Sequence, residues 1–143
     1  LEADTVLIAV GGGGLIGGAM AWLEGRCKVV GVEPFNAPTL TKALQTGPQT
    51  TVEVSGVAAN ALGAKQVGRI CYDLAQATGT KTVNVEDDAI SKAQVLLWER
   101  LRQLVEPAGA AALAAILSGA YIPQKGERVA VLLCGANPAP SPL

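Results

Sequence analysis

The sequence contains no histidine in 143 residues. Histidine is the commonest general base in enzymes, and nucleophilic sites of the Ser-His-Asp and Cys-His types depend on it. Chemistry of those types is therefore excluded within this chain. Cysteine is scarce as well: Cys27, Cys71 and Cys134 are odd in number and far apart, which fits neither a disulfide framework nor a CxxC metal site. A reducing cytoplasm is the expected compartment.

Aromatic residues and long apolar runs are also rare. Phe, Trp and Tyr make up 3% of the chain, and its 11 basic residues are scattered among 12 acidic ones, so we expect no nucleic-acid partner. The longest nearly all-apolar stretch, residues 108–117, is about half the length of a membrane span. No charged-then-apolar leader precedes the first strand, so no membrane association is expected. Half of the residues are hydrophobic, enough for the core of a single domain.

Short apolar runs alternate along the chain with segments of helical periodicity. This alternation predicts an α/β fold in three layers, a parallel β-sheet with helices on both faces. Residues 49–63 are ambiguous, because Val52, Val54 and Val57 alternate as in a strand before an Ala/Gly-rich turn. The predicted strands are residues 5–10, 28–33, 82–85 and 128–133, and the predicted helices are residues 15–23, 39–45, 65–77, 88–104 and 108–117, the last with Pro107 at its first position.

Apolar side chains at helical spacing predict the buried faces of two of these helices. The first face is expected at Val67, Ile70 and Leu74, and Gly79 is expected to end that helix. The second face is predicted to consist of Ile90, Ala93, Leu97, Leu101 and Leu104.

Four consecutive glycines, residues 11–14, stand between the first predicted strand and the first predicted helix. Ordering so many glycines costs chain entropy, so a folded protein keeps them where a side chain would obstruct something. A strand-to-helix turn presents unpaired backbone N–H groups and the positive end of the helix dipole, which together suit a phosphate. The sequence therefore predicts an anion site here. A tight turn packed closely on the sheet is the structural alternative.

One reading of this loop is a dinucleotide site. Gly12, Gly14 and Gly17 satisfy the G-x-G-x-x-G pattern after a strand, and Glu33 ends the next strand, where a ribose-binding acid belongs. An NAD-binding domain is therefore one hypothesis. It leaves unexplained the additional glycine, the proline directly after the acid, and the lack of a clear third strand soon afterwards.

Four segments together resemble a known family: "VGGGGLIGG", "VVGVEP", "WERLRQLVEPAGAAALAA" and "VLLCGAN". In this order and at these separations they look like the C-terminal half of pyridoxal-phosphate-dependent threonine and serine dehydratases of fold type II, with serine racemase a close relative. The resemblance runs from about Asp4 to Asn137. It implies a truncated domain of that family over residues 1–137, resembling part of the large domain, followed by a C-terminal tail at residues 138–143.

The resemblance implies where pyridoxal 5'-phosphate would bind. The N–H groups that would hold its phosphate belong to Gly11, Gly12, Gly13, Gly14 and Leu15. Cys134 matches the Ser or Cys that contacts the pyridine nitrogen in this family, where a weak thiol donor would leave that nitrogen largely unprotonated and favour β-elimination. Taken alone, Cys134 is also typical of a small buried core residue.

Two further positions are implied to lie near the cofactor. Glu106 matches an acid near its ring, and this residue is also suited to capping the helix that Pro107 starts. Gly56, in "VSGVAANALGAK", matches a segment beside the cofactor in which Ser55 replaces an Asp of the family.

Glu33 matches a carboxylate that holds a divalent cation in the racemase and in some dehydratases. The other family ligands are the carbonyl four residues on, here Ala37, and an Asp two beyond that, replaced here by Thr39. One carboxylate and one carbonyl make a poor Mg²⁺ or Ca²⁺ site, so a metal ion is possible there and not favoured. The alternative role of Glu33 is to cap the next helix.

The family's catalytic residues are expected to be absent from this chain. Its Schiff-base lysine, its loop for the substrate carboxylate and its Asn facing the cofactor hydroxyl lie in the N-terminal half, which this sequence does not contain. The chain alone is therefore expected to be inactive and to carry no catalytic residue. The lysines present have other sequence contexts and are expected at the surface: Lys28, Lys42, Lys65, Lys81, Lys92 and Lys125.

Three hypotheses about function remain open. In the first, an N-terminal half on the same or a partner chain completes a lyase that converts threonine or serine to a 2-oxo acid and ammonia. In the second, the chain is a non-catalytic half-domain that serves as a binding module. Its exposed sheet edge and core face would then be covered in a homo-oligomer. The third is the NAD-binding domain.

Overall fold

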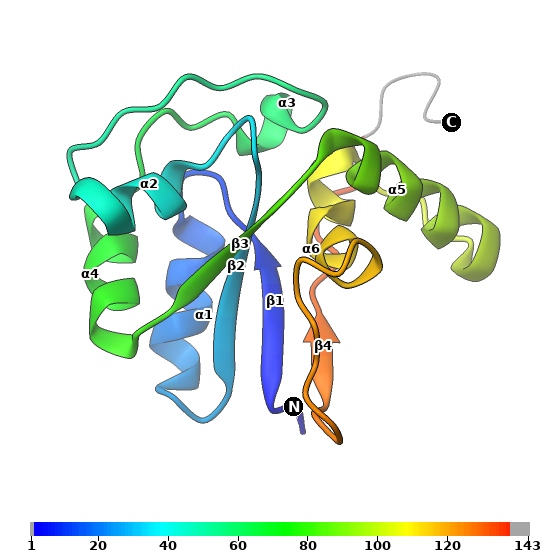
Figure 1. The fold of residues 1–143 in the computed structure, drawn as a ribbon, viewed down its shortest axis with the longest axis horizontal. Coiled ribbons are helices and arrows are strands. Elements are labelled where there is room, and N and C mark those ends of the chain that lie inside the picture. Colours follow the sequence, from blue (N-terminus) through cyan, green and yellow to red (C-terminus); the bar gives the residue numbers. More distant parts are fainter. Residues whose placement is uncertain (1, 138–143) are drawn as a thin grey trace.

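The computed structural model describes residues 2–137, so the predicted tail at residues 138–143 lies outside the described part. Its centre is a parallel sheet with the strand order β3-β2-β1-β4 (Figure 1). β1 pairs with β2 from Thr5 opposite Lys28 to Ala9 opposite Val32, and with β4 on its other side. The strands are β1 (Thr5–Ala9), β2 (Lys28–Pro34), β3 (Lys81–Val85) and β4 (Val129–Val131).

Helices cover both faces of this sheet, which confirms the predicted α/β architecture. The helices are α1 (Gly14–Leu23), α2 (Thr39–Thr46), α3 (Ala59–Leu62), α4 (Arg69–Thr78), α5 (Asp87–Leu101) and α6 (Pro107–Leu117). One core joins α1, α2 and α4 to the sheet through residues such as Val6 and Ile8. The other joins α3, α5 and α6 to Leu7 and Ala9. Successive side chains of a strand point to opposite faces, so β1 supplies both cores.

The small residues of α6 bring that helix close to the sheet. Seven of its residues are buried, among them Ala110, Ala111 and Ala114, and the helix contacts three strands. Pro107 occupies its first turn as predicted, where the missing N–H costs nothing. In the part of the chain that the structure describes, no helix is both long enough and apolar enough to cross a membrane.

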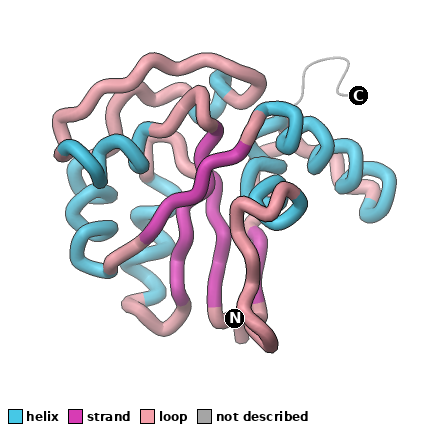
Figure 2. Tube along the Cα trace, viewed as in Figure 1, coloured by secondary structure: helices cyan, strands magenta, loops and turns pink. Residues whose placement is uncertain are grey.

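The segment between α2 and α4 is not a strand. Val52, Val54 and Val57 lie in a loop that crosses the molecule beyond the carboxyl ends of the strands and contains only the short helix α3 (Figure 2). The segment left ambiguous from the sequence is therefore a loop, in spite of its alternating valines. Val52 donates its N–H to the carbonyl of Lys65, so this loop bonds to its own return segment and joins no sheet.

Two helices differ in length from their predictions. α4 begins at Arg69 and not near residue 65, because the N–H of Gly68 donates to the carbonyl of Gly12, 2.9 Å away. Ile70 was wrongly assigned to the buried face: it is 78% exposed, and Cys71 and Ala75 face the core in its place. Gly79 ends α4 in the left-handed conformation, as predicted.

α5 ends earlier than its apolar periodicity indicates. Arg102 adopts a left-handed conformation with φ 55° and closes the helix after Leu101. Leu101 and Leu104 are 58% and 39% exposed and were wrongly assigned to the apolar face, whereas Val105 is buried in the core. Ile90, Ala93 and Leu97 are buried as predicted.

Candidate functional site

The glycine loop lies at the carboxyl end of β1. Val10 still donates its N–H to Val32 of β2, after which the chain turns into α1 with Gly13 as the N-cap residue at φ 91°. Within residues 2–137, no acceptor is found for the backbone N–H groups of residues 11–16. The first turn of a helix leaves such groups without intrahelical partners, and they carry its positive partial charge. The loop therefore offers a concentrated set of free donors.

The four glycines divide into two kinds. A Cβ on Gly11 would lie 3.1 Å from the Cα of Leu62, and Gly13 combines a positive φ with a Cβ position only 2.6 Å from the sulfur of Cys71. The fold itself requires these two glycines. A Cβ on Gly12 would make only an ordinary contact with Ala64, and one on Gly14 would meet nothing within 4 Å. Packing within the described chain gives no reason for glycine at positions 12 and 14.

A hollow of about 220 Å³ opens beside this loop. It brings together most of the predicted cofactor-binding residues, although they come from three distant parts of the chain. Ala61 and Leu62 of α3 also line it and were not anticipated, because the sequence around them gave no clear secondary structure. The predicted residues on its wall are Gly11, Gly12, Gly13, Gly14, Leu15, Glu106 and Cys134.

Close packing between α6 and the chain after β4 places Glu106 and Cys134 on this wall. A Cβ on Gly109 would overlap the carbonyl oxygen of Cys134, and one on Gly135, at φ 76°, would overlap the Glu106 carboxylate. The N–H of Glu106 donates to the carbonyl of Gly135 at 3.3 Å. Glu106 occupies the N-cap position of α6, but its side chain makes no capping hydrogen bond.

Burial raises the pKa of the Cys134 thiol, and the negative charge of Glu106 acts in the same direction. Cys134 is therefore a protonated, neutral thiol at pH 7, able to donate a weak hydrogen bond. It is only partly buried and faces the hollow, in contrast to Cys27 and Cys71, which are buried in the sheet–helix core.

Gly56 is not on the wall of this hollow. It lies in the loop before α3 at φ 90°, with the carboxylate of Asp87 where a side chain would be. Ser55 beside it is exposed and donates its N–H to the carbonyl of Asn36. Contact between Gly56 and a cofactor stays a prediction.

Glu33 is fully buried and hydrogen bonded to the beginning of α2. Oε1 accepts from the N–H of Leu40 at 2.7 Å, and Oε2 accepts from the N–H and the hydroxyl of Thr41 at 2.8 and 2.6 Å. Burial raises the pKa of Glu33, although the hydrogen bonds oppose this shift. The observed partners are those of a helix-capping residue, the alternative role considered from the sequence.

The other residues of the predicted metal site are also committed elsewhere. Ala37 is buried in the turn after β2, where its N–H donates to the carbonyl of Pro34. Thr39 donates its hydroxyl to the carbonyl of Ala64 at 2.7 Å. Across residues 2–137, no group of three or more His, Cys, Asp or Glu side chains is placed to hold a metal ion. These residues do not fit a divalent cation.

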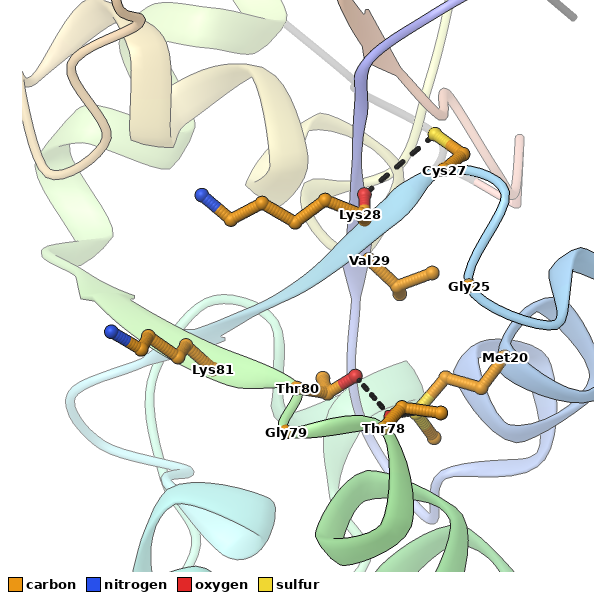
Figure 3. A pocket seen from close by; sticks show the side chains of 9 residues that line it. All are labelled: Met20, Gly25, Cys27, Lys28, Val29, Thr78, Gly79, Thr80 and Lys81. Atoms are coloured by element: carbon orange, nitrogen blue, oxygen red, sulfur yellow. Dashed lines mark hydrogen bonds between the residues drawn. The ribbon is translucent and has the colours of Figure 1, made fainter.

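A second hollow, of about 270 Å³, lies at the opposite end of the sheet. Figure 3 shows Lys28 and Lys81, at the amino ends of β2 and β3, with both amines directed to the same side and away from Met20. Open parallel sheets bind ligands at the carboxyl ends of their strands. The smaller hollow at the glycine loop is therefore the better candidate, although it is not the larger of the two.

Comparison with known proteins identifies the family. The family model described as pyridoxal-phosphate dependent enzyme matches residues 1–135. A phenylserine dehydratase of Ralstonia pickettii is 36% identical over 94% of this chain and 42% of its own length. For an L-threonine ammonia-lyase of Thermotoga maritima the identity is 31%, over 95% of this chain and 34% of the relative. The chain thus spans less than half the length of these curated relatives.

Solved structures agree with these sequence matches. A threonine deaminase of T.th. superposes with a TM-score of 0.84 at 32% identity, covering 99% of this chain and 53% of that one. Maize serine racemase superposes with a TM-score of 0.87 at 26% identity, covering 98% and 45%. The chain belongs to the family of pyridoxal-phosphate dependent enzymes, as a domain of the threonine/serine dehydratase-like kind with the fold type II architecture.

Proposed function

We propose that the protein containing this chain is a pyridoxal-phosphate-dependent ammonia-lyase that converts threonine or serine to a 2-oxo acid and ammonia. The role of this chain is to bind the cofactor's phosphate and ring. The observation that carries the proposal is that packing within residues 2–137 gives no reason for glycine at positions 12 and 14, beside N–H groups that have no acceptor in those residues. A phosphate in the hollow would explain both features, because it needs close approach of bare backbone and several N–H donors.

Each part of the wall has a distinct task in this proposal. When bound, pyridoxal phosphate supplies an electron-withdrawing ring that lets an amino acid lose its α-proton and then its β-substituent. The N–H groups of Gly12 to Leu15 and the dipole of α1 bind the phosphate dianion. Cys134 offers a neutral thiol to the ring nitrogen, and a neutral thiol does not hold a proton there as a carboxylate would. Glu106 packs beside Cys134 and keeps this part of the wall negative.

The amine that carries the cofactor covalently comes from outside the described residues. All six lysines of the chain are exposed, and none of them lines the glycine-loop hollow. A lysine that acts as a nucleophile is typically desolvated in a pocket beside its target, and these exposed amines are not. The proposal therefore assigns this lysine, and the binding of the substrate carboxylate, to a segment other than residues 2–137.

Two alanine substitutions in α1, one at the proposed phosphate site and one away from it as a control, test the proposal. A Cβ at Gly14 or at Gly18 meets nothing within 4 Å, so both changes fit the fold and favour the helix. Only Gly14 lines the hollow beside Glu106 and Cys134. In the full-length protein, we expect Gly14→Ala to weaken pyridoxal phosphate binding by about tenfold or more, and Gly18→Ala to change it by less than about twofold. Absorbance titration measures both.

The same preparations separate the alternatives. Equal cofactor affinity in the two variants would contradict the phosphate site. NAD binding without pyridoxal phosphate binding would support the dinucleotide hypothesis, which shares the 3-2-1-4 strand order but would require Glu33, here fully buried, to reach a ribose. Cofactor binding without 2-oxo acid formation from threonine or serine would support a non-catalytic binding module. A lysine of this chain trapped by borohydride would contradict the assignment of that lysine elsewhere.

A further inference from the structure

One carboxylate joins three loops at the carboxyl end of the sheet. Asp87 begins α5, and its Oδ2 accepts hydrogen bonds from the N–H of Val57 at 3.1 Å and from the side-chain amide of Asn36 at 3.4 Å. The carbonyl of Asn36 in turn accepts the N–H of Ser55 at 3.0 Å. The chain after β2, the chain before α3 and the start of α5 are thereby connected.

The Asp87 carboxylate occupies the space that a side chain at position 56 would need. At φ +90°, a Cβ on Gly56 would lie 2.5 Å from Oδ2 and 2.9 Å from Oδ1 of Asp87. Oδ1 is buried and has no hydrogen-bond partner among the described residues. A buried carboxylate oxygen without a partner is costly, and native structures keep few of them. The carboxylate of Asp87 thus lies close against this loop while only one of its oxygens has hydrogen-bond partners among the described residues.

The loop held by Asp87 leads directly into the wall of the glycine-loop hollow. Ala58 is buried, and its carbonyl accepts the N–H of Leu62 at 2.8 Å in the turn of α3. Leu62 approaches the glycine loop so closely that a Cβ on Gly11 would lie 3.1 Å from its Cα. Ala61 and Leu62 both line the hollow. A shift of residues 55–57 would therefore move α3 against the glycine loop.

We propose that Asp87 is a positioning residue for the cofactor site. Its carboxylate fixes residues 55–57, so that α3 presents Ala61 and Leu62 to the glycine loop at the spacing the hollow requires. Asp87 is not itself on the wall of the hollow, so it acts through α3. This inference rests on the proposed function, namely that the hollow receives pyridoxal phosphate.

Asp88 provides a matched control for Asp87. Both lie in the first turn of α5 and interact with its dipole, but Asp88 is exposed and pairs with Lys92 on the same helix. In the full-length protein, we expect Asp87→Ala to weaken pyridoxal phosphate binding by about tenfold, and Asp88→Ala by less than about twofold. Asp87→Asn keeps an oxygen for the N–H of Val57 and should restore most of the affinity. Absorbance titration and visible circular dichroism of the bound cofactor measure these effects.

The readouts distinguish positioning from a structural role. Positioning predicts that Asp87→Ala changes the visible dichroism of the bound cofactor and speeds amide exchange in residues 57–62, while Asp88→Ala changes neither. Unchanged cofactor affinity and dichroism in Asp87→Ala, beside a cofactor-binding wild type, would overturn the inference and leave the proposed function standing. A wild type that binds no pyridoxal phosphate would overturn the proposed function, and this inference with it.

Discussion

At the scale of one residue, the role of Glu33 in the structure differs from the metal-binding role that its sequence context implied. Glu33 lies near the end of β2, where the family resemblance implied a metal ligand, yet its oxygens accept hydrogen bonds from Leu40 and Thr41. The Thr41 hydroxyl continues this network to the hydroxyl of Thr82 at 2.8 Å. The start of α2 thus supplies the positive partial charge that a cation would otherwise provide. A buried carboxylate is tolerated here because donors surround it.

We therefore expect the protein to gain no stability from divalent cations. The melting temperature of the wild type should be the same, within about 1 °C, in excess Mg²⁺, Ca²⁺ or EDTA, since ion binding to the folded state alone would raise it. Glu33→Gln should lower stability by about 2 kcal/mol, because the amide nitrogen would face an N–H donor of α2. Thr41→Val, which removes one hydroxyl, is the milder control. If Mg²⁺ stabilised the wild type but not Glu33→Gln, this prediction would be wrong and Glu33 would be a metal ligand.

At the scale of elements, the sequence correctly predicted the strands and helices whose apolar residues are spaced as a buried face requires. β1, β2, β3, α1, α2 and α6 lie within a residue or two of their predicted bounds. The errors fall at two helix ends that apolar periodicity does not mark. Gly68 begins α4 by bonding to Gly12, and Arg102 ends α5 in a left-handed conformation that few residues adopt. The first depends on a contact between residues distant in sequence and the second on a local backbone conformation, and apolar periodicity reports neither.

The candidate site was predictable to the extent that its residues stand in motifs. The glycine loop, Glu106 and Cys134 were named from the sequence and line one hollow. Ala61 and Leu62 were not named, because alanine and leucine in an ambiguous segment carry no chemical signal. The interaction of Asp87 with Val57 crosses 30 residues of sequence, and an acid in the first turn of a helix already has a local explanation.

Glu127 connects elements at the other end of the sheet and makes stability depend on pH. It accepts hydrogen bonds from the hydroxyls of Thr5 in β1 and Tyr121 after α6, each at 2.5 Å, and from the N–H of Gln124 at 2.7 Å. Led by the Thr5 hydroxyl, these donors lower its pKa from 4.5 to about 2. A carboxylate whose pKa falls on folding contributes stability above its unfolded pKa, and that contribution is lost as the pH falls.

We expect Glu127→Gln to lower the melting temperature at pH 7. The difference from the wild type should shrink as the pH falls from about 4.5 to about 2, because the wild-type carboxylate becomes protonated over that range. Glu53→Gln, at an exposed residue whose ion pair with Lys65 is also exposed, should cause little change at any pH. Thermal unfolding followed by circular dichroism measures this. A melting-temperature difference that stays constant over this pH range would show that Glu127 acts through packing and not through its charge.

At the scale of the whole molecule, the two cores cover the sheet faces, and the strands at the two edges of the sheet are β3 and β4. Among residues 2–137, β4 pairs with β1 alone. The N–H of Leu132 donates to Leu7 of β1, and N–H directions alternate along a strand, so those of Val131 and Leu133 point to the open side. Leu133 is also 36% exposed. Native proteins cover or block such edges, because an open edge pairs with other chains.

We expect this edge to be covered in the full-length protein. Hydrogen exchange should then be as slow at the amides of Val131 and Leu133 as at those of β2, whose amides lie inside the sheet. Light scattering on the same sample tells what covers the edge. Slow exchange at a monomer mass would indicate another segment of the same polypeptide, whereas slow exchange lost on dilution, together with a higher mass, would indicate the self-association predicted from the sequence. Fast exchange at both amides in a monomer would contradict both forms of cover, and the fold would then have to tolerate an open parallel edge beside a proposed cofactor site.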